Sequence, residues 1–291
     1  MLPKQSGPEV VTVESEIEDV SRQTGSAQTS VIVHPGEFYV ASVPPKDFFV
    51  KAGAPYRAEA LCVAPDGARR AGVSVKLEAI RRTWHTIVEE SGEDGLHYES
   101  RPVDKVVSTC TAQSSASGSA ACDLAIAEPG YLIVRATAQD ARKNPLASSV
   151  GFYATGDAID LAWQRTDASL LELVPDKKSY EVGDAAKILV KNPFRDAEAL
   201  VTVERAGVYK QDRVKLSGPM PTLEVKVADD MRPNVYVTVS LVRGRVGAPV
   251  KGEGSGGDVG APAFAVGTTS LEVNRESRRL KIDLSTKKKS F

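Results

Sequence analysis

Apolar and polar residues alternate in short runs along most of the chain, and these runs predict its secondary structure. A period of two residues places successive side chains on opposite faces of a β-strand, whereas an amphipathic helix repeats about every 3.6 residues. No stretch keeps the helical period for more than about two turns. We predict strands at residues 31–33, 39–43, 58–63, 73–80, 106–110, 131–138, 187–190, 200–204, 223–227 and 235–242.

Residues that form turns separate the predicted strands. Pro fixes φ, Gly permits positive φ, and Asn and Asp bond to the nearby backbone, so all of them interrupt strands. Such residues occur at 44–45, 64–67, 128–130, 192–193 and 217–219. Short strands about ten residues apart, with turns between them, are typical of antiparallel β-sandwiches. We therefore predict an all-β protein of antiparallel sandwiches rather than an α/β protein.

A ten-residue sequence occurs twice, at 171–180 and at 282–291. Leu-Glu-Leu-Val-Pro-Asp-Lys-Lys-Ser-Tyr returns as Ile-Asp-Leu-Ser-Thr-Lys-Lys-Lys-Ser-Phe, and the copies begin 111 residues apart (282 − 171). A sandwich of this kind has roughly 100 residues. A looser version, 48–53, resembles 179–184. The repeat predicts a string of sandwich modules.

The repeat also predicts where the modules begin and end. Residues 1–34 hold too few strands to close a sandwich, so we interpret them as the last strands of a truncated upstream module. Two complete sandwiches are expected, at 35–168 and 169–279. Residues 280–291 would then be the first strand of a truncated downstream module.

A glycine-rich segment, 246–263, lies inside the second predicted sandwich. It has almost no bulky side chain, so ordering it would cost more backbone entropy than burial returns, and we expect a flexible loop. Gly252 to Gly257 spell G-x-G-x-x-G, but that dinucleotide fingerprint requires a strand before it and a helix after it. Pro262 and a strand-like run follow instead, which favours a loop over a phosphate site.

Charge and hydropathy give no reason to expect a nucleic-acid or membrane partner. The chain has 37 Lys and Arg against 38 Asp and Glu, a formal net charge of −1, so bulk electrostatics would not attract a polyanion. No apolar run approaches the roughly 18 residues that span a membrane, so direct insertion is not expected. Residues 1–8 lack the apolar core of a signal peptide, so we expect no export signal within this chain.

The chain has three cysteines, Cys62, Cys110 and Cys122. Cys110 and Cys122 lie in strand-like segments that flank a Ser/Ala/Gly loop, so they could face each other across a hairpin. Three interpretations stay open: a structural disulfide, which would add on the order of 3 kcal/mol; two buried thiols; and metal ligation, which lacks a nearby His. Oxidation would require an exported protein. Cys62 is expected to be a buried core thiol.

No arrangement of residues indicates catalysis. The histidines are His34, His85 and His97, and none lies in a motif such as G-x-S-x-G or H-E-x-x-H. We interpret the carboxylate runs as solvated turns. Trp84 and Trp163 are expected to fill sandwich cores rather than to stack on sugars. We therefore expect no enzyme activity, no catalytic residue, no cofactor and no metal site.

Several segments of the second predicted sandwich carry a specific pattern. They are 176–186, 191–194, 199–208, 232–237 and 241–245. In this order they resemble the bacterial alpha-2-macroglobulins. Weaker matches on both sides extend the resemblance over nearly the whole chain.

The resemblance implies macroglobulin-type sandwiches, which are similar to fibronectin III and Ig domains, and a protease trap. In such traps a peptidase cuts an exposed bait segment, the modules close around it, and many members then capture it through a thioester between the Cys and Gln of Cys-Gly-Glu-Gln. Cys62, Cys110 and Cys122 are followed by Val, Thr and Asp rather than by Gly. We therefore expect a scaffold fragment that lacks the thioester.

The resemblance also implies that residues 170–280 form the bait-region domain, although the segment that is cut could lie beyond Phe291. Arg243, Arg245 and Lys251 would suit a trypsin-like peptidase, because the glycine-rich loop offers extended, unpaired backbone. The alternative is a long hairpin connection that no peptidase cuts.

The implied partners are peptidases and neighbouring macroglobulin domains of a longer chain, and the implied localisation is periplasmic or extracellular. The competing function is an adhesive or carbohydrate-binding sandwich array, which an exposed aromatic platform on one sheet face would favour. A degraded reading frame with no independent role is the third interpretation.

Overall fold

The computed structural model describes residues 7–46, 49–91, 95–156, 163, 169–194, 196–248, 260–283 and 285, and within 88–91 and 95–98 it describes the backbone alone. The chain divides into two compact units. The first comprises Met1–Pro45, Val50–Arg82 and Asp104–Ala154, and the second comprises Lys46–Phe49, Thr83–Val103 and Thr155–Phe291. The module boundaries expected from the repeat stay predictions.

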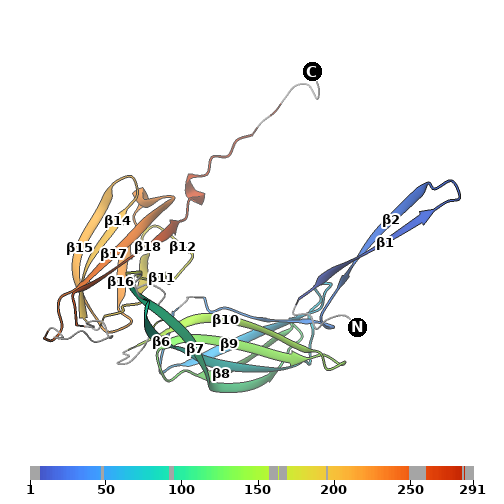
Figure 1. Cartoon of the computed structure of the whole chain (residues 1–291), viewed down its shortest axis with the longest axis horizontal. Coiled ribbons are helices and arrows are strands. Elements are labelled where there is room, and N and C mark those ends of the chain that lie inside the picture. The colour runs from blue at the N-terminus through green and yellow to red at the C-terminus, as the bar shows by residue number, and fades with distance from the viewer. Residues whose placement is uncertain are drawn as a thin grey trace. The chain divides into compact units, whose positions relative to one another are not determined.

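The first sandwich packs a three-stranded sheet, ordered β3-β5-β8, against a five-stranded sheet, ordered β4-β10-β9-β6-β7 (Figure 1). Alternation forms its core. In β9 the residues Leu132, Val134, Ala136 and Ala138 are buried, and more exposed residues stand between them. The strands are β3 (Tyr39–Ser42), β4 (Phe49–Lys51), β5 (Pro55–Val63), β6 (Ser74–Ser91), β7 (Gly95–Gln113), β8 (Ser119–Ala125), β9 (Gly130–Gln139) and β10 (Pro145–Thr155).

The second sandwich packs the sheet β11-β13-β16 against the sheet β12-β18-β17-β14-β15. In β17 the residues Val235, Val237, Val239 and Leu241 are fully buried at every second position. The strands are β11 (Leu173–Pro175), β12 (Ser179–Tyr180), β13 (Ala185–Val190), β14 (Asp196–Glu204), β15 (Val208–Ser217), β16 (Thr222–Lys226), β17 (Asn234–Arg243) and β18 (Ala263–Val273). Two short 3-10 helices, η2 (Asp229–Met231) and η3 (Glu276–Arg278), complete it.

The two sandwiches have the same strand order. Adding eight to each strand number of the first sandwich gives the order of both sheets of the second. The turn after the second strand of each sandwich, β4 or β12, is also shared. Gly53 and Gly183 have φ of 85° and 97°, and their N–H groups donate to Ile126 O and Val227 O at 2.7 and 2.9 Å. The prediction of an all-β protein with tandem antiparallel sandwiches is confirmed.

The repeated sequence lies at the crossing between the sheets of the second sandwich. Its first copy forms β11 and β12, and β12 leaves the sheet of β11 to pair in parallel with β18. Within the second copy, 282–291, the structure describes residues 282, 283 and 285, and these are in no strand. The expected first strand of a downstream module therefore stays a prediction.

A separate hairpin, β1 (Glu9–Glu18) and β2 (Thr24–Val33), precedes the first sandwich. Its strands form a two-stranded sheet of their own, and none of their side chains is fully buried. This hairpin corresponds to the strands expected within residues 1–34.

Candidate functional site

The candidate protease-sensitive segment connects β17 to β18. The two strands stay paired as far as Arg243 and Ala263. Beyond this pair, the N–H of Val246 donates to Gly260 O at 2.9 Å and closes the base of the loop. Lys251 lies outside the described residues, so its place in the predicted loop stays untested.

The two arginines of this segment differ in their surroundings. Arg243 is the last residue of β17 and is half-buried, its Nη2 donates to Ala261 O at 2.6 Å, and its guanidinium lies 5.1 Å from the Phe194 ring centroid. Arg245 lies two residues further on, outside the strand, and is exposed. Proteolytic cuts concentrate in exposed segments outside regular strands. The geometry therefore favours cleavage after Arg245 over cleavage after Arg243.

Cys110 and Cys122 are joined by a disulfide, with Cα atoms 6.3 Å apart. Cys110 lies in β7 and Cys122 in β8, and these are outer strands of the two different sheets of the first sandwich. The bond thus ties one sheet to the other, whereas the sequence suggested two strands of a single hairpin.

Cys62 is a free thiol and is fully buried in β5. Burial raises the pKa of this thiol, and a hydrogen bond with Ser114 opposes that rise. A thiol is a nucleophile only when it is ionised and accessible. Cys62 therefore has the properties of a core residue.

Trp163 is buried in the second unit, and Trp84 beside it is only partly buried. Trp163 is 7% exposed, and its indole N–H donates to Pro219 O at 2.8 Å. The Trp84 ring is 6.4 Å from the Trp163 ring, and Lys191 Nζ lies 5.2 Å from the same Trp163 ring. Burial lowers the pKa of Lys191, and the neighbouring Glu172 opposes this. These rings are used for packing and do not form an exposed platform for a sugar.

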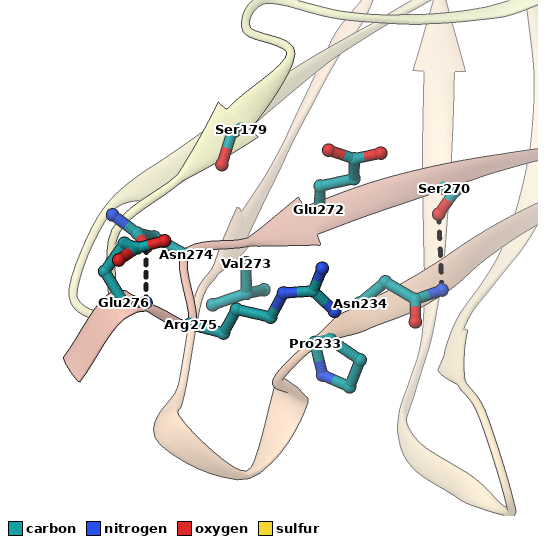
Figure 2. Close-up of a pocket in the computed structure, with 9 residues that line it drawn as sticks. All are labelled: Ser179, Pro233, Asn234, Ser270, Glu272, Val273, Asn274, Arg275 and Glu276. Carbon is teal, nitrogen blue, oxygen red and sulfur yellow. Dashed lines mark hydrogen bonds between the residues drawn. The ribbon is translucent and has the colours of Figure 1, made fainter. Parts of the chain in front are cut away.

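A polar depression lies at the end of β18, beside β12 (Figure 2). Asn234 Nδ2 donates to Ser270 Oγ at 3.4 Å, and the N–H of Glu276 donates to Asn274 Oδ1 at 2.8 Å. The residues that line it include Ser179, but neither a histidine nor a cysteine.

The histidines do not converge on a site either. His34 Nδ1 lies 2.6 Å from the Tyr39 hydroxyl, His85 is exposed on β6, and the His97 side chain lies outside the described part of the chain. Among the described residues, no three His, Cys, Asp or Glu side chains gather in a way that could hold a metal ion. The described helices are all too short to cross a membrane.

A family model and the curated relatives both point to the alpha-2-macroglobulins. Residues 171–290 match the family model described as "Alpha-2-macroglobulin bait region domain". Over 284 residues the chain is 25% identical to an "Alpha-2-macroglobulin homolog" of Nostoc sp., which covers 95% of this chain and 14% of the relative. This chain is related to the bacterial alpha-2-macroglobulins.

Other alpha-2-macroglobulins match more locally or more weakly. The "Alpha-2-macroglobulin" of Xylella fastidiosa strain Temecula1 is 32% identical over 115 residues, which are 39% of this chain and 6% of that protein. The native conformation of E. coli alpha-2-macroglobulin, a cryo-EM structure, has a TM-score of 0.36 and 19% identity over 96% of this chain and 18% of its own. The chain thus spans a small part of the alpha-2-macroglobulins it matches.

Proposed function

We propose that this chain is a non-enzymatic scaffold segment of an alpha-2-macroglobulin-like endopeptidase inhibitor. The observation that carries the proposal is the match of residues 171–290 to a bait region domain, because that span contains the whole second sandwich and its β17–β18 loop. In this role the sandwiches hold the loop in position and a peptidase meets it there. Arg245 supplies the basic side chain that a trypsin-like enzyme requires.

Covalent capture is not part of the proposed role. A thioester needs a reactive cysteine at the start of Cys-Gly-Glu-Gln, and none of the three cysteines begins that sequence. Cys110 and Cys122 are bonded to each other and Cys62 is buried, which supports the same view.

The proposed partners are peptidases and neighbouring macroglobulin domains of a longer chain, and the proposed location is the periplasm or the outside of the cell. The Cys110–Cys122 bond supports an oxidising compartment, because structural disulfides persist there and are rare in the cytosol.

Limited digestion with trypsin tests the proposal. The first cuts are expected in the β17–β18 loop, identified by mass spectrometry of the early fragments, since both sandwiches are paired and packed. First cuts at other positions, with this loop surviving, would contradict a bait-like role. Saturable binding of the intact chain on a glycan array would instead support the carbohydrate-binding alternative.

A further inference from the structure

The peptide bond between Arg245 and Val246 has a nitrogen atom whose hydrogen is already bonded. This N–H belongs to Val246 and donates to Gly260 O at 2.9 Å. Just before it along the chain, Arg243 and Ala263 form the last pair of β17 and β18. The bond after Arg245 therefore lies between two cross-strand contacts, although Arg245 itself is exposed.

Gly247 sets the direction of the chain directly after this bond. Its φ is 76°, in the left-handed region that glycine enters readily and residues with a Cβ do not. A Cβ built on Gly247 would meet no atom within 4 Å, so the preference for glycine comes from the backbone conformation alone. Gly244 has equally open surroundings, but its φ lies outside the left-handed region. The turn that follows Val246 therefore depends on Gly247.

A cut after Arg245 changes the geometry at the Val246 nitrogen. In the intact peptide bond, resonance with the carbonyl group holds the N–H in the peptide plane. A serine peptidase attacks the carbonyl carbon of Arg245, its histidine passes the proton of the attacking serine to the Val246 nitrogen, and the C–N bond breaks. Water then releases the Arg245 carboxylate from the acyl-enzyme and restores the serine. The nitrogen becomes pyramidal, so its hydrogen leaves the plane in which it meets Gly260 O.

The closed contact also occupies the nitrogen that the enzyme has to reach. Gly260 O stands 2.9 Å from the Val246 nitrogen, to which the histidine of the peptidase must bring its proton. Cleavage therefore takes place in an open form, in which the N–H of Val246 has left Gly260 O. When opening and closing are fast relative to cleavage, the observed rate is proportional to the open fraction.

We propose that the hydrogen bond from Val246 N–H to Gly260 O is an autoinhibitory contact for the cut after Arg245. Gly247 is the positioning residue that allows this contact to form. The inference rests on the proposed function, because the peptidase that cuts after Arg245 is the partner proposed there. The exposed Arg245 marks where the cut falls, and the contact at the base of the loop limits how fast it occurs.

Two variants of the full chain weaken the contact and leave the Arg245–Val246 bond itself unchanged. Gly247→Ala strains the turn and is expected to raise kcat/KM of trypsin for the cut after Arg245 at least about fivefold. Ala261→lactic acid, made by semisynthesis, places the Gly260 carbonyl in an ester, whose oxygen is a weaker acceptor, and should raise it about two- to fivefold. Fragment masses at early times measure the cut. The amide hydrogen of Val246 should exchange faster by similar factors.

Two controls separate the contact from the preferences of trypsin. Gly244→Ala adds the same methyl group to a glycine outside the left-handed region, so it should change the rate less than about twofold. A free peptide of residues 240–250 lacks Gly260, so Gly247→Ala should change its cleavage by less than about twofold as well.

The outcomes separate this inference from the proposed function. If trypsin cuts after Arg245 but neither Gly247→Ala nor Ala261→lactic acid accelerates the cut, the autoinhibitory contact is wrong and the proposed function stands. Equal acceleration by Gly244→Ala, or by Gly247→Ala in the free peptide, would also overturn the contact. If the first cuts fall outside the β17–β18 loop in every variant, the proposed function is contradicted and the inference falls with it.

Discussion

The phenol of Tyr180 donates a hydrogen bond of 2.7 Å to Oδ1 of Asp176, and both side chains are buried. The same Asp176 oxygen accepts from the N–H of Lys187 in β13 at 2.9 Å, and the Tyr180 hydroxyl accepts from the N–H of Lys177 at 3.1 Å. Because Tyr180 lies in β12, on the other sheet, this cluster fastens the chain where it crosses between the sheets of the second sandwich. It explains why the first copy of the repeat carries Asp and Tyr four residues apart.

Removing the Tyr180 hydroxyl should destabilise the second sandwich. Tyr180→Phe leaves the buried Asp176 carboxylate without one donor, and the expected loss is about 1–3 kcal/mol in the free energy of unfolding. Urea denaturation measures it. Tyr236→Phe is the matched control, since Tyr236 is 44% exposed, and it should change stability by less than about 0.5 kcal/mol. Equal effects of the two variants would contradict a role for the Asp176–Tyr180 bond.

The Glu78 carboxylate should contribute an acid-sensitive part of the stability of the first sandwich. Lys76 Nζ lies 2.7 Å from Glu78 Oε1 and Arg135 Nη2 lies 3.0 Å from Oε2. The hydrogen bond from Lys76, followed by that from Arg135, lowers the pKa of Glu78, although burial opposes the shift. The unfolded chain ionises at the ordinary Glu pKa of about 4.3, so this stabilisation is complete above that pH and is lost as the pH falls through the lower folded pKa.

Melting temperatures between neutral pH and about pH 2 measure this effect. In Glu78→Gln, the melting temperature of the first sandwich should fall less on acidification than it does in the original protein. Glu224→Gln removes the same charge from an exposed position of the second sandwich and should leave that fall in place. If the melting temperature of Glu78→Gln fell at low pH as much as that of the original protein, other groups would be the cause of the acid sensitivity.

Reduction should weaken the first sandwich and spare the second. The Cys110–Cys122 bond closes a loop with a sequence separation of 12, for which chain entropy gives roughly 3 kcal/mol. All three cysteines lie in the first unit, so only its denaturant transition should shift when dithiothreitol is added. The Cys110→Ser, Cys122→Ser double variant should already show the shift and should not respond to the reductant. If dithiothreitol shifted the denaturant transition of the second sandwich by the same amount, the disulfide would not act on the first sandwich alone.

Trypsin should distinguish the two arginines of the β17–β18 segment. Arg245→Gln is expected to slow the early cut near this position at least about tenfold, whereas Arg243→Gln should leave it nearly unchanged, because Arg243 is paired and half-buried. Fragment masses over a time course measure both rates. Faster early cleavage after Arg243 than after Arg245 would show that the end of β17 opens more readily than its contacts imply.

The sequence predicted strands well where one face of the strand is buried. In β9 and β17 every second residue is a core residue, so the alternation is regular. It gave no signal for β15, because most of its side chains are exposed on both faces. In β18 the alternation is interrupted by Gly267, where a Cβ would overlap the carbonyl oxygen of Leu171. Such a close backbone approach depends on tertiary packing, which no local pattern reveals.

The candidate site was only partly predictable. Composition located the loop after β17, but it treated Arg243 and Arg245 alike, since their difference arises from contacts with Ala261 and Phe194. The spacing of Cys110 and Cys122 suggested one hairpin, yet the strands that contain them, β7 and β8, belong to different sheets. In both cases the missing information is long-range pairing, which short motifs do not encode.

Two interactions hold the ends of the β17–β18 loop together. They are the hydrogen bond from Val246 N–H to Gly260 O and the strand pair Arg243↔Ala263. A cut between residues 246 and 260 would break the covalent backbone, but the ten residue pairs between β17 and β18 would still hold the two parts together. A nicked molecule would therefore migrate as one particle under native conditions and separate into two polypeptides only in denaturant. Any conformational change that follows cleavage would therefore occur within the loop or in neighbouring domains, because β18 would stay paired with β17.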